Sequence, residues 1–386
     1  MTLDLLLVNA PSRRSVYGGL TDLAAIEPPV WAGLIARHCL DRGFTVAILD
    51  AEAEGLTFAE TARRISELQP RLAAFAIYGQ QPSASTQCLP AASCVVQALK
   101  AYDAGHSIPT LAFGTHPSAL PERTLREEPF DFVCEGEGPR TIAALLVSTS
   151  LKDIPGLWCR GGLPPVLSQN VDDLNNELPN QAIELLDLTR YRAHNWHLWT
   201  GNSSGGYATI QTSLNCAFAC SFCCIAAPFG DRKMRFWSPN NIAAQIQRFV
   251  SLGCTNLKVA DEMFCLNRAH VLGICDGLIE RGLGNKLNMW AYARVDTVKD
   301  TEMLEKMRRA GFRWLGIGVE SGSKHVRDGV DKGKFGDDDI RTAIARVHAA
   351  DICVAANYIF GLPDDTRETM QATLDLACEL NTEWAN

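Results

Sequence analysis

Residues 207–224, YATIQTSLNCAFACSFCC, decide the fold of this 386-residue chain. They begin with a short apolar run, YATIQTS (207–213), and continue directly into a cysteine-rich loop. The run has the composition of a buried strand, and similar runs recur on both sides of it, separated by segments with helical spacing. The loop is therefore expected at the carboxyl end of a strand in an α/β protein, where such folds place their chemistry.

The alternation continues from this stretch toward the C-terminus. Further apolar runs are NLKVADEMF (256–264), KLNMWAYAR (286–294), RWLGIGVES (313–321) and ICVAANYIFGLP (352–363), and helical segments are expected at 240–252, 268–282, 301–310, 337–350 and 366–380. Repeated strand–helix units predict a partial (β/α)6, TIM-like barrel over residues 207–386. The closing LNTEWAN stops where another strand is expected, so we expect the barrel to be truncated before its sixth strand.

Residues 1–150 show the same alternation toward the N-terminus. Near-continuous apolar runs at 3–9, 44–50, 71–78, 108–113 and 131–134 predict a doubly wound, Rossmann-like parallel sheet. Turn-rich stretches follow these runs: NAPSRR (9–14) follows the first, and three further turns are YGQQPSAST (78–86), FGTHPSALPE (113–122) and CEGEGPR (134–140). The carboxyl ends of parallel strands share one edge, so these turns predict a ligand crevice there.

Residues 151–206 lack clear periodicity and predict a linker between the two halves. Their last part holds His194, Trp196, His197 and Trp199, which could stack on a ligand. Packing of these aromatic side chains onto a neighbouring part of the protein is the favoured interpretation.

Composition excludes several function classes. The chain is 47% hydrophobic and 21% charged, which indicates a globular protein and not a disordered one. A net charge of -8 disfavours nucleic acid as a partner. No segment approaches the roughly 18 apolar residues that span a bilayer, and MTLDLLLVNAPSRR lacks the basic start of a signal peptide. We therefore expect no membrane partner and a cytoplasmic location, where most of the 14 scattered cysteines serve as small core residues.

Three cysteines form the strongest local motif. Cys216, Cys220 and Cys223 follow C-x3-C-x2-C spacing on one loop, and thiolates this close indicate a metal site. Structural zinc requires a fourth ligand, and none is apparent nearby; the adjacent Cys224 is expected to point elsewhere. Three thiolates suit a 4Fe-4S cluster with one open iron that chelates a substrate or cofactor, with zinc or a chance grouping as the alternatives.

This motif, with Phe222 before its last cysteine, resembles the radical S-adenosylmethionine (radical SAM) superfamily. The resemblance implies that the open iron holds S-adenosyl-L-methionine (SAM) and that one electron cleaves SAM to a 5′-deoxyadenosyl radical. An external donor such as flavodoxin or ferredoxin would supply that electron.

Later strand ends match the family's SAM-binding positions in order. By this resemblance, Asp261 and Glu262 hold the methionine amino group and Arg294 meets the methionine carboxylate; Glu320 and Ser321 bind the ribose, Asn357, Ile359 and Gly361 lie near the adenine, and Phe222 joins the same site. Singly, an acid at a strand end is as often a helix cap, and an arginine often pairs with a neighbouring carboxylate. Their recurrence at four consecutive strand ends favours the binding role.

The N-terminal half resembles the cobalamin-binding domain that precedes the radical barrel in one subfamily. The matching stretches are 27–53 and the three turns above, and they imply corrin contacts from Ser83, Ser85, Thr86, Gly114, Thr115, His116, Glu135, Gly136 and Glu137. His116 lacks the surrounding residues of an Asp-x-His-x-x-Gly motif and is not assigned as an axial ligand. No GxGxxG follows the first strand, so a dinucleotide is not expected.

Together, the two resemblances cover nearly the whole chain and imply a cobalamin-dependent radical SAM enzyme. The activity that they imply is C-methyl transfer to an unactivated carbon of a small biosynthetic intermediate. Alternatives are rearrangement, cyclisation or oxidation without methyl transfer, and a non-catalytic cobalamin carrier or sensor. The intact cysteine loop and strand-end residues disfavour the carrier, and the acidic balance disfavours a tRNA substrate. The sequence identifies neither the substrate nor a catalytic side chain.

Overall fold

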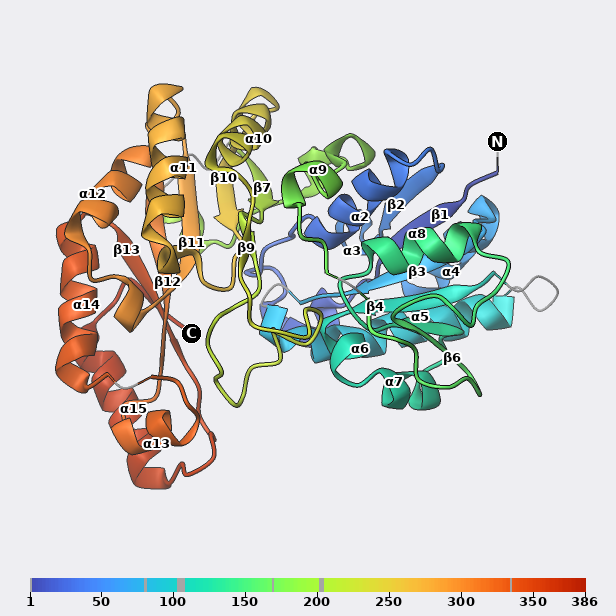
Figure 1. Cartoon of the computed structure of the whole chain (residues 1–386). Helices are drawn as coiled ribbons and strands as arrows, with labels where there is room; N and C mark the ends of the chain where they lie inside the picture. The colour runs from blue at the N-terminus through green and yellow to red at the C-terminus, as the bar shows by residue number, and fades with distance from the viewer. Residues whose placement is uncertain (1, 80–81, 103–107, 169, 201–204, 334) are drawn as a thin grey trace. The chain divides into compact units, whose positions relative to one another are not determined.

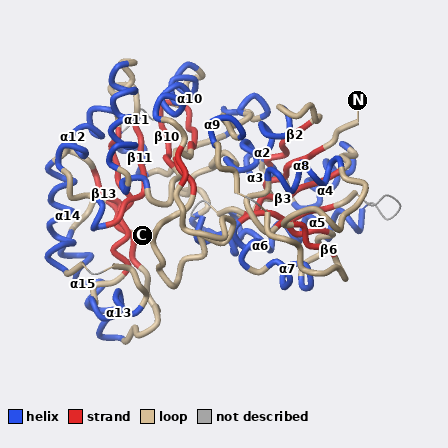
Figure 2. Tube along the Cα trace, in the orientation of Figure 1, coloured by secondary structure: helices blue, strands red, loops and turns tan. Residues whose placement is uncertain are grey.

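A computed structural model describes residues 2–79, 82–102, 108–168, 170–200, 205–333 and 335–386, without the side chains of residues 82 and 83. The chain divides into two compact units, one formed by 1–192 with 224–232 and the other by 193–223 with 233–386. In both units helices flank a mainly parallel sheet (Figure 2). No helix within the described ranges is both long and apolar enough to cross a bilayer.

The sheet of the first unit has the order β2-β1-β3-β4-β5-β6 (Figure 1). Its strands are β1 (Leu5–Asn9), β2 (Val46–Asp50), β3 (Leu72–Ile77), β4 (Thr110–Gly114), β5 (Phe132–Cys134) and β6 (Leu157–Cys159). All neighbours are parallel except β5 and β6. The order changes direction at β1, which is the point where open α/β sheets bind ligands. This confirms the predicted doubly wound sheet.

Helices cover both faces of this sheet. They are α1 (Arg13–Tyr17), α2 (Val30–Leu40), α3 (Ala51–Glu54), α4 (Phe58–Leu68), α5 (Leu89–Tyr102), α6 (Thr115–Ala119), α7 (Pro121–Glu127), α8 (Pro139–Val147) and α9 (Leu174–Glu177), with 3-10 turns η1 (Gly18–Leu20), η2 (Pro82–Cys88), η3 (Ile183–Leu185) and η4 (Leu188–Arg190). The sequence signals are local: Thr57 and Glu60, for example, form the capping box that begins α4.

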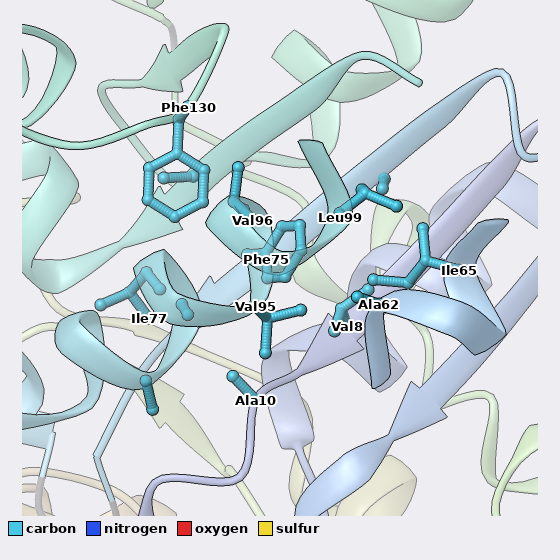
Figure 3. Packing of buried hydrophobic residues seen from close by; sticks show 14 of the residues in the cluster. Val8, Ala10, Ala62, Ile65, Phe75, Ile77, Val95, Val96, Leu99 and Phe130 are labelled. Atoms are coloured by element: carbon cyan, nitrogen blue, oxygen red, sulfur yellow. The ribbon is translucent and has the colours of Figure 1, made fainter. Parts of the chain in front are cut away.

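The main core of the first unit lies between one sheet face and helices α4 and α5. Figure 3 shows Phe75 of β3 among Val8 of β1 and Val95, Val96 and Leu99 of α5. Phe75 is fully buried and meets Phe130 edge-on at 5.6 Å between ring centroids. Burial of each such side chain contributes roughly 1.5–3 kcal/mol, so this layer holds the strand ends that carry the turns in place.

The sheet of the second unit has the order β14-β13-β12-β11-β10-β7, all parallel. Its strands are β7 (Gly206–Ile210), β10 (Cys254–Val259), β11 (Asn288–Arg294), β12 (Phe312–Glu320), β13 (Cys353–Tyr358) and β14 (Trp384–Ala385); a separate ladder joins β8 (Ser213–Leu214) to β9 (Arg235–Phe236). The sequence predicted that the chain ends before a sixth strand, whereas the structure has the two residues of β14 paired with β13.

The helices of the second unit follow the strands in alternation. They are α10 (Pro239–Ser251), α11 (Arg268–Glu280), α12 (Thr301–Ala310), α13 (Lys324–Gly329), α14 (Asp337–Ala349) and α15 (Arg367–Leu380), with turns η5 (Trp196–Thr200), η6 (Phe264–Leu266) and η7 (Val295–Thr297). Their ends follow the expected signals: Asp300 caps the start of α12 by accepting from Met303 N at 3.0 Å, and Gly311 ends it at φ 109°.

The predicted linker is divided between the two units. Residues 151–192 belong to the first unit, where β6 pairs antiparallel with β5, and residues from 193 onward belong to the second. There the ring centroid of Trp196 lies 5.3 Å from that of Trp290 and 4.9 Å from that of Trp314. His197 Nε2 lies 2.9 Å from Asn288 O. These aromatic residues therefore pack within the second unit, as the favoured interpretation expected.

Candidate functional site

The cysteine loop of the second unit begins where β8 ends. Asn215 adopts φ 78°, and its side-chain oxygen accepts from Cys216 N at 2.8 Å, which turns the chain out of the ladder. The next cysteines are joined by a bond from Cys223 N to Cys220 O of 3.1 Å. Between them, Ser221 N donates to Val330 O at 3.1 Å. Backbone bonds thus hold the loop beside the end of α13.

The three thiols fit an iron–sulfur cluster. None of Cys216, Cys220 and Cys223 forms a disulfide. In the described ranges no three His, Cys, Asp or Glu side chains surround one point as ligands of a single ion would. A 4Fe-4S cube takes each cysteine on a separate iron, so three thiolates suit it, whereas structural zinc needs four ligands. Burial raises the pKa of Cys216, and a bound cationic cluster would favour its thiolate.

Arg294 links the end of β11 to this loop. Its Nη1 donates to Cys220 Sγ at 3.5 Å, and its Nε and Nη2 each bind one oxygen of Asp296 at 2.9 Å. The guanidinium carbon lies 3.6 Å from the ring centroid of Phe218. The side chain is 2% exposed, so its charge is held in place next to the cysteines. A fixed cation here suits a carboxylate ligand.

The neighbouring acids at the end of β10 differ in their surroundings. Both carboxylate oxygens of Asp261 are occupied, because Thr212 N, Thr212 Oγ1 and Ser213 Oγ each donate to it at 2.6 Å. These bonds favour a positioning role for Asp261 at the start of the cysteine loop. Glu262 Oε2 is enclosed and has no hydrogen-bond partner among the described residues. Burial raises the pKa of Glu262 to about 8, with a further contribution from Asp261. An ammonium ligand would satisfy this oxygen.

Glu320 ends β12 in a strained conformation. Its φ of 66° is left-handed, which is uncommon for a non-glycine residue and often marks a functional site. Its Oε1 accepts from Lys332 Nζ at 2.6 Å, and its carbonyl accepts from Ile359 N at 2.8 Å. A methyl group at Gly318 would overlap both Glu320 Oε1 and Lys332 Nζ, so a larger residue there would displace this ion pair. Lys332 and the backbone bond from Ile359 therefore fix the position of the Glu320 carboxylate.

The other predicted SAM-site residues have mixed surroundings. Ser321 is fully buried, and its Oγ contacts Thr373 Oγ1 at 3.2 Å, which favours a role in anchoring α15. Asn357 Oδ1 accepts from Asn386 Nδ2 at 2.8 Å. Gly361 has φ 85° and donates to Asp365 Oδ2 at 2.8 Å, and Phe222 is 37% exposed. Parallel pairing brings the ends of β10 to β13 to one sheet edge.

In the first unit, the turn after β4 lies at the corresponding carboxyl edge. Gly114 has φ 127°, and a methyl group there would overlap Ile77 O. Thr115 is fully buried, and its Oγ1 has no partner among the described residues. His116 Nδ1 lies 2.9 Å from Thr86 Oγ1, and burial lowers the pKa of His116. This turn therefore presents one enclosed hydroxyl that a bound ligand could satisfy.

Most of the remaining predicted corrin residues already form hydrogen bonds within the first unit. Glu135 Oε2 accepts from Trp158 Nε1 at 2.7 Å, and Glu137 Oε2 accepts from Val171 N at 2.7 Å. Gly136, at φ 119°, donates to Ser118 Oγ at 3.1 Å. Ser85 is buried and accepts from Gly79 N at 3.1 Å. The side chain of Ser83 lies outside the described residues.

Sequence reasoning missed three side chains at the site of the second unit. Lys332 pairs with Glu320, and Lys258 pairs in register with Thr209, two residues before Gln211. Lys332 lies on a loop without a motif, and Lys258 lies within an otherwise ordinary strand run. The signal that could have identified Lys258 is a charged residue within an otherwise apolar strand.

Comparison with known proteins places this geometry in a family. A model of the B12 binding domain matches residues 18–146, and a model of the radical SAM superfamily matches residues 210–377. The chain carries a B12 binding domain followed by a radical SAM domain, the two domains of cobalamin-dependent radical SAM enzymes. The family assignment confirms the predicted cofactors, which are a 4Fe-4S cluster, SAM and cobalamin.

Several relatives of this radical SAM enzyme have low sequence identity to it but align with nearly its whole length. The chain is 27% identical to an uncharacterized methyltransferase of Pyrococcus horikoshii, over 99% of this chain and 79% of that protein. It is 24% identical to the anaerobic magnesium-protoporphyrin IX monomethyl ester cyclase of Cereibacter sphaeroides, over 96% of this chain and 59% of that protein. The fold matches the radical SAM methyltransferase TsrM of Kitasatospora setae with a TM-score of 0.74 at 19% identity, covering 100% and 72% of the two chains.

Proposed function

We propose that this radical SAM enzyme transfers a methyl group to an unactivated carbon of a small biosynthetic intermediate. The observation that carries the proposal is the gathering of Glu262, Arg294 and Glu320 at the strand edge beside the cysteine loop. Similarity to a protein named a methyltransferase over 99% of the chain supports methyl transfer. Bound together, the three cofactors supply a radical that removes a substrate hydrogen atom and a methyl group that replaces it.

In this proposal each site residue binds or orients one part of the cofactors. Cys216, Cys220 and Cys223 hold the cluster, and the enclosed Glu262 carboxylate accepts the SAM ammonium. Arg294 pairs with the SAM carboxylate. Charge-assisted bonds of this kind are about twice as strong as neutral ones, and burial strengthens them further.

The ribose and adenine ends are assigned to the neighbouring strands. Glu320, fixed by Lys332, accepts from the ribose hydroxyls, and Ser321 holds the backbone that follows it. Asn357, Ile359, Gly361 and Phe222 border the adenine. Asp261 contributes by holding Thr212 and Ser213 at the start of the cysteine loop.

We assign cobalamin to the first unit, with residues 1–150 as the binding domain and 207–386 as the radical barrel. The turn Gly114–His116 and the backbone near Gly136 provide the close approach that a corrin needs. Thr115 offers the unsatisfied hydroxyl, whereas the bonds on Glu135 and Glu137 limit those acids to supporting the turn.

The proposal also covers partners and location. We infer a small-molecule substrate, no nucleic-acid or membrane partner, and an electron donor such as flavodoxin or ferredoxin. The net charge of -8 supports the absence of nucleic acid. None of the 14 cysteines forms a disulfide, which supports a reducing cytoplasm.

Cyclisation without methyl transfer is the second candidate. The similarity to a protein named a cyclase, over 96% of this chain, favours it specifically. Both candidates use the same cysteine loop and SAM residues, so they differ in the fate of the substrate and not in these residues.

Isotope transfer separates the two candidates. The holoenzyme, reconstituted without oxygen, is incubated with methyl-deuterated SAM and candidate intermediates. An intact labelled methyl group in the product supports methyl transfer; a converted product without the label supports cyclisation or rearrangement instead. The chemistry depends on iron, so we expect about four irons per wild-type chain and a loss of the cluster in Cys220→Ala. Cys224→Ala is the matched control and retains its iron; a full cluster in Cys220→Ala contradicts the assignment.

A further inference from the structure

The inner face of the second unit's sheet is built in layers. Register pairs Thr209 with Lys258, Lys258 with Trp290, Trp290 with Trp314, and Trp314 with Cys353. Parallel strands in register place these side chains in one row on one face. Trp196 and Trp384 pack against this row. We call the row itself the floor layer. Its members are Thr209, Lys258, Trp290, Trp314 and Cys353, so two indole rings lie among a hydroxyl, an ammonium and a thiol group.

The next layer toward the strand carboxyl ends consists mainly of small residues. Tyr292 pairs with Gly316, and Gly316 pairs with Ala355. Ala260 joins the row through its bond from N to Ile210 O of 2.7 Å. Barrel interiors are normally filled by bulky branched side chains. Trp384 completes this layer by pairing with Ala355, and the Tyr292 ring lies over Gly316. Two aromatic rings beside three small residues suit a planar ligand between the floor layer and the strand-end site.

Lys258 is the cation of the floor layer. It is 1% exposed, and its Nζ lies 5.0 Å from the centroid of the Trp290 ring and 5.6 Å from that of Tyr292. Its charge acts on Glu262, so the ammonium lies within electrostatic reach of the strand-end site. Burial makes such a charge interact with a ligand anion far more strongly than it would in water.

Two further polar atoms in these layers have no hydrogen-bond partner among the described residues. They are Trp290 Nε1, a donor, and Gln211 Oε1, an acceptor. Their side chains are 3% and 5% exposed. A buried group without a partner costs about 1–3 kcal/mol, which a ligand with matching groups would recover. Gln211 is the residue directly after β7 and follows Thr209 by two positions.

We propose that Lys258 and Trp290 bind a carboxylate of the substrate inside this barrel, with Gln211 accepting from a neighbouring donor group. The planar body of the substrate would lie against Tyr292, over the small residues. The substrate class is thus a planar carboxylic acid. This inference rests on the proposed function, because it assigns the substrate end opposite to the SAM site.

The test compares an acid with its amide, which has the same shape but no charge. Indole-3-propionate and indole-3-propionamide are titrated by calorimetry into the SAM-loaded holoenzyme without oxygen. We expect the acid to bind about tenfold more tightly than the amide, which corresponds to about 1.4 kcal/mol. Lys258→Met should abolish this preference while the amide affinity stays the same. Iron content and thermal unfolding show whether the variant is folded.

Two tryptophan variants keep the test independent of Lys258. Trp290→Phe retains a ring but removes the unpartnered N–H, and it should weaken acid binding about fivefold. Trp314→Phe is the matched control, because its Nε1 already donates to Thr200 Oγ1 at 2.6 Å; the acid preference should persist in it.

Several outcomes would overturn the inference. These are equal binding of acid and amide, no binding of either at millimolar concentration, or an unchanged preference in folded Lys258→Met. Failure of the proposed function looks different: the wild-type holoenzyme would form no 5′-deoxyadenosine from SAM, while the acid preference and its dependence on Lys258 persisted.

Discussion

Arg294 Nη1 lies 3.5 Å from Cys220 Sγ, while its other nitrogens bind Asp296. One guanidinium therefore joins the last residue of β11 to the middle of the cysteine loop. This contact connects two parts of the site that are far apart in sequence.

Arg294→Lys tests this connection. Lysine keeps the charge but cannot make the two parallel bonds to Asp296 while reaching the sulfur. We expect SAM to bind about tenfold more weakly, measured by equilibrium dialysis with reconstituted protein. Arg308→Lys, whose native side chain pairs with Asp351 on the surface, should leave SAM affinity unchanged. Equal affinities of the wild type and Arg294→Lys would remove Arg294 from the SAM site.

Glu262 should make the stability of the cofactor-free protein depend on pH. Its pKa is raised from 4.5 to about 8 in the folded state. Between these values the unfolded chain releases this proton and the folded chain keeps it, so the free energy of unfolding falls as pH rises. The change over the whole range is at most about 5 kcal/mol, at roughly 1.4 kcal/mol per pKa unit. Urea unfolding from pH 5 to pH 8 measures it.

Glu262→Gln should remove this part of the pH dependence, since an amide does not titrate. The exposed Glu305 provides the control Glu305→Gln, which should follow the wild type. A pH profile that is the same in Glu262→Gln and the wild type would contradict the raised pKa.

The buried ion pair between Lys332 and Glu320 should matter more than a surface pair. Lys332→Met leaves the Glu320 carboxylate buried without its partner, and we expect a loss of about 3 kcal/mol in the free energy of unfolding. Lys324→Met removes an exposed pair with Asp328 and should cost less than about 0.5 kcal/mol. Urea unfolding at pH 7 compares the two. Similar losses in both would show that Lys332 does not hold Glu320.

Thr115 should contribute to cobalamin binding and not to the stability of the fold. Thr115→Val removes a buried hydroxyl that has no partner among the described residues, so the stability of the cofactor-free protein should not fall. Cobalamin binding, followed by corrin absorption, should weaken about fivefold. Thr110→Val, at the start of the preceding strand β4, removes a bond to Asp131 Oδ2 of 2.7 Å and should cost about 1 kcal/mol while leaving cobalamin affinity intact. The reverse pattern would contradict the assignment.

The sequence predicted the repeated elements well because their signals are local. Apolar runs anticipated the strands β1 to β5 and β7, β10, β11, β12 and β13, and the cysteine spacing is complete within eight residues. It missed β6 and β14, which have three and two residues and so carry little periodicity of their own. These short strands form because an existing strand, β5 or β13, offers its free edge.

By itself, the sequence determined two α/β halves, the cysteine triad and the order of polar residues at successive strand ends. Only the tertiary structure decided which of those residues have free polar atoms. Asp261 and Glu262 are neighbours in sequence, yet one is fully bonded to Thr212 and Ser213 and the other keeps an enclosed oxygen without a partner among the described residues. Likewise, Lys258 meets Trp290 only through strand register. Hydrogen bonding and burial depend on residues distant along the chain, and spacing alone does not specify those contacts.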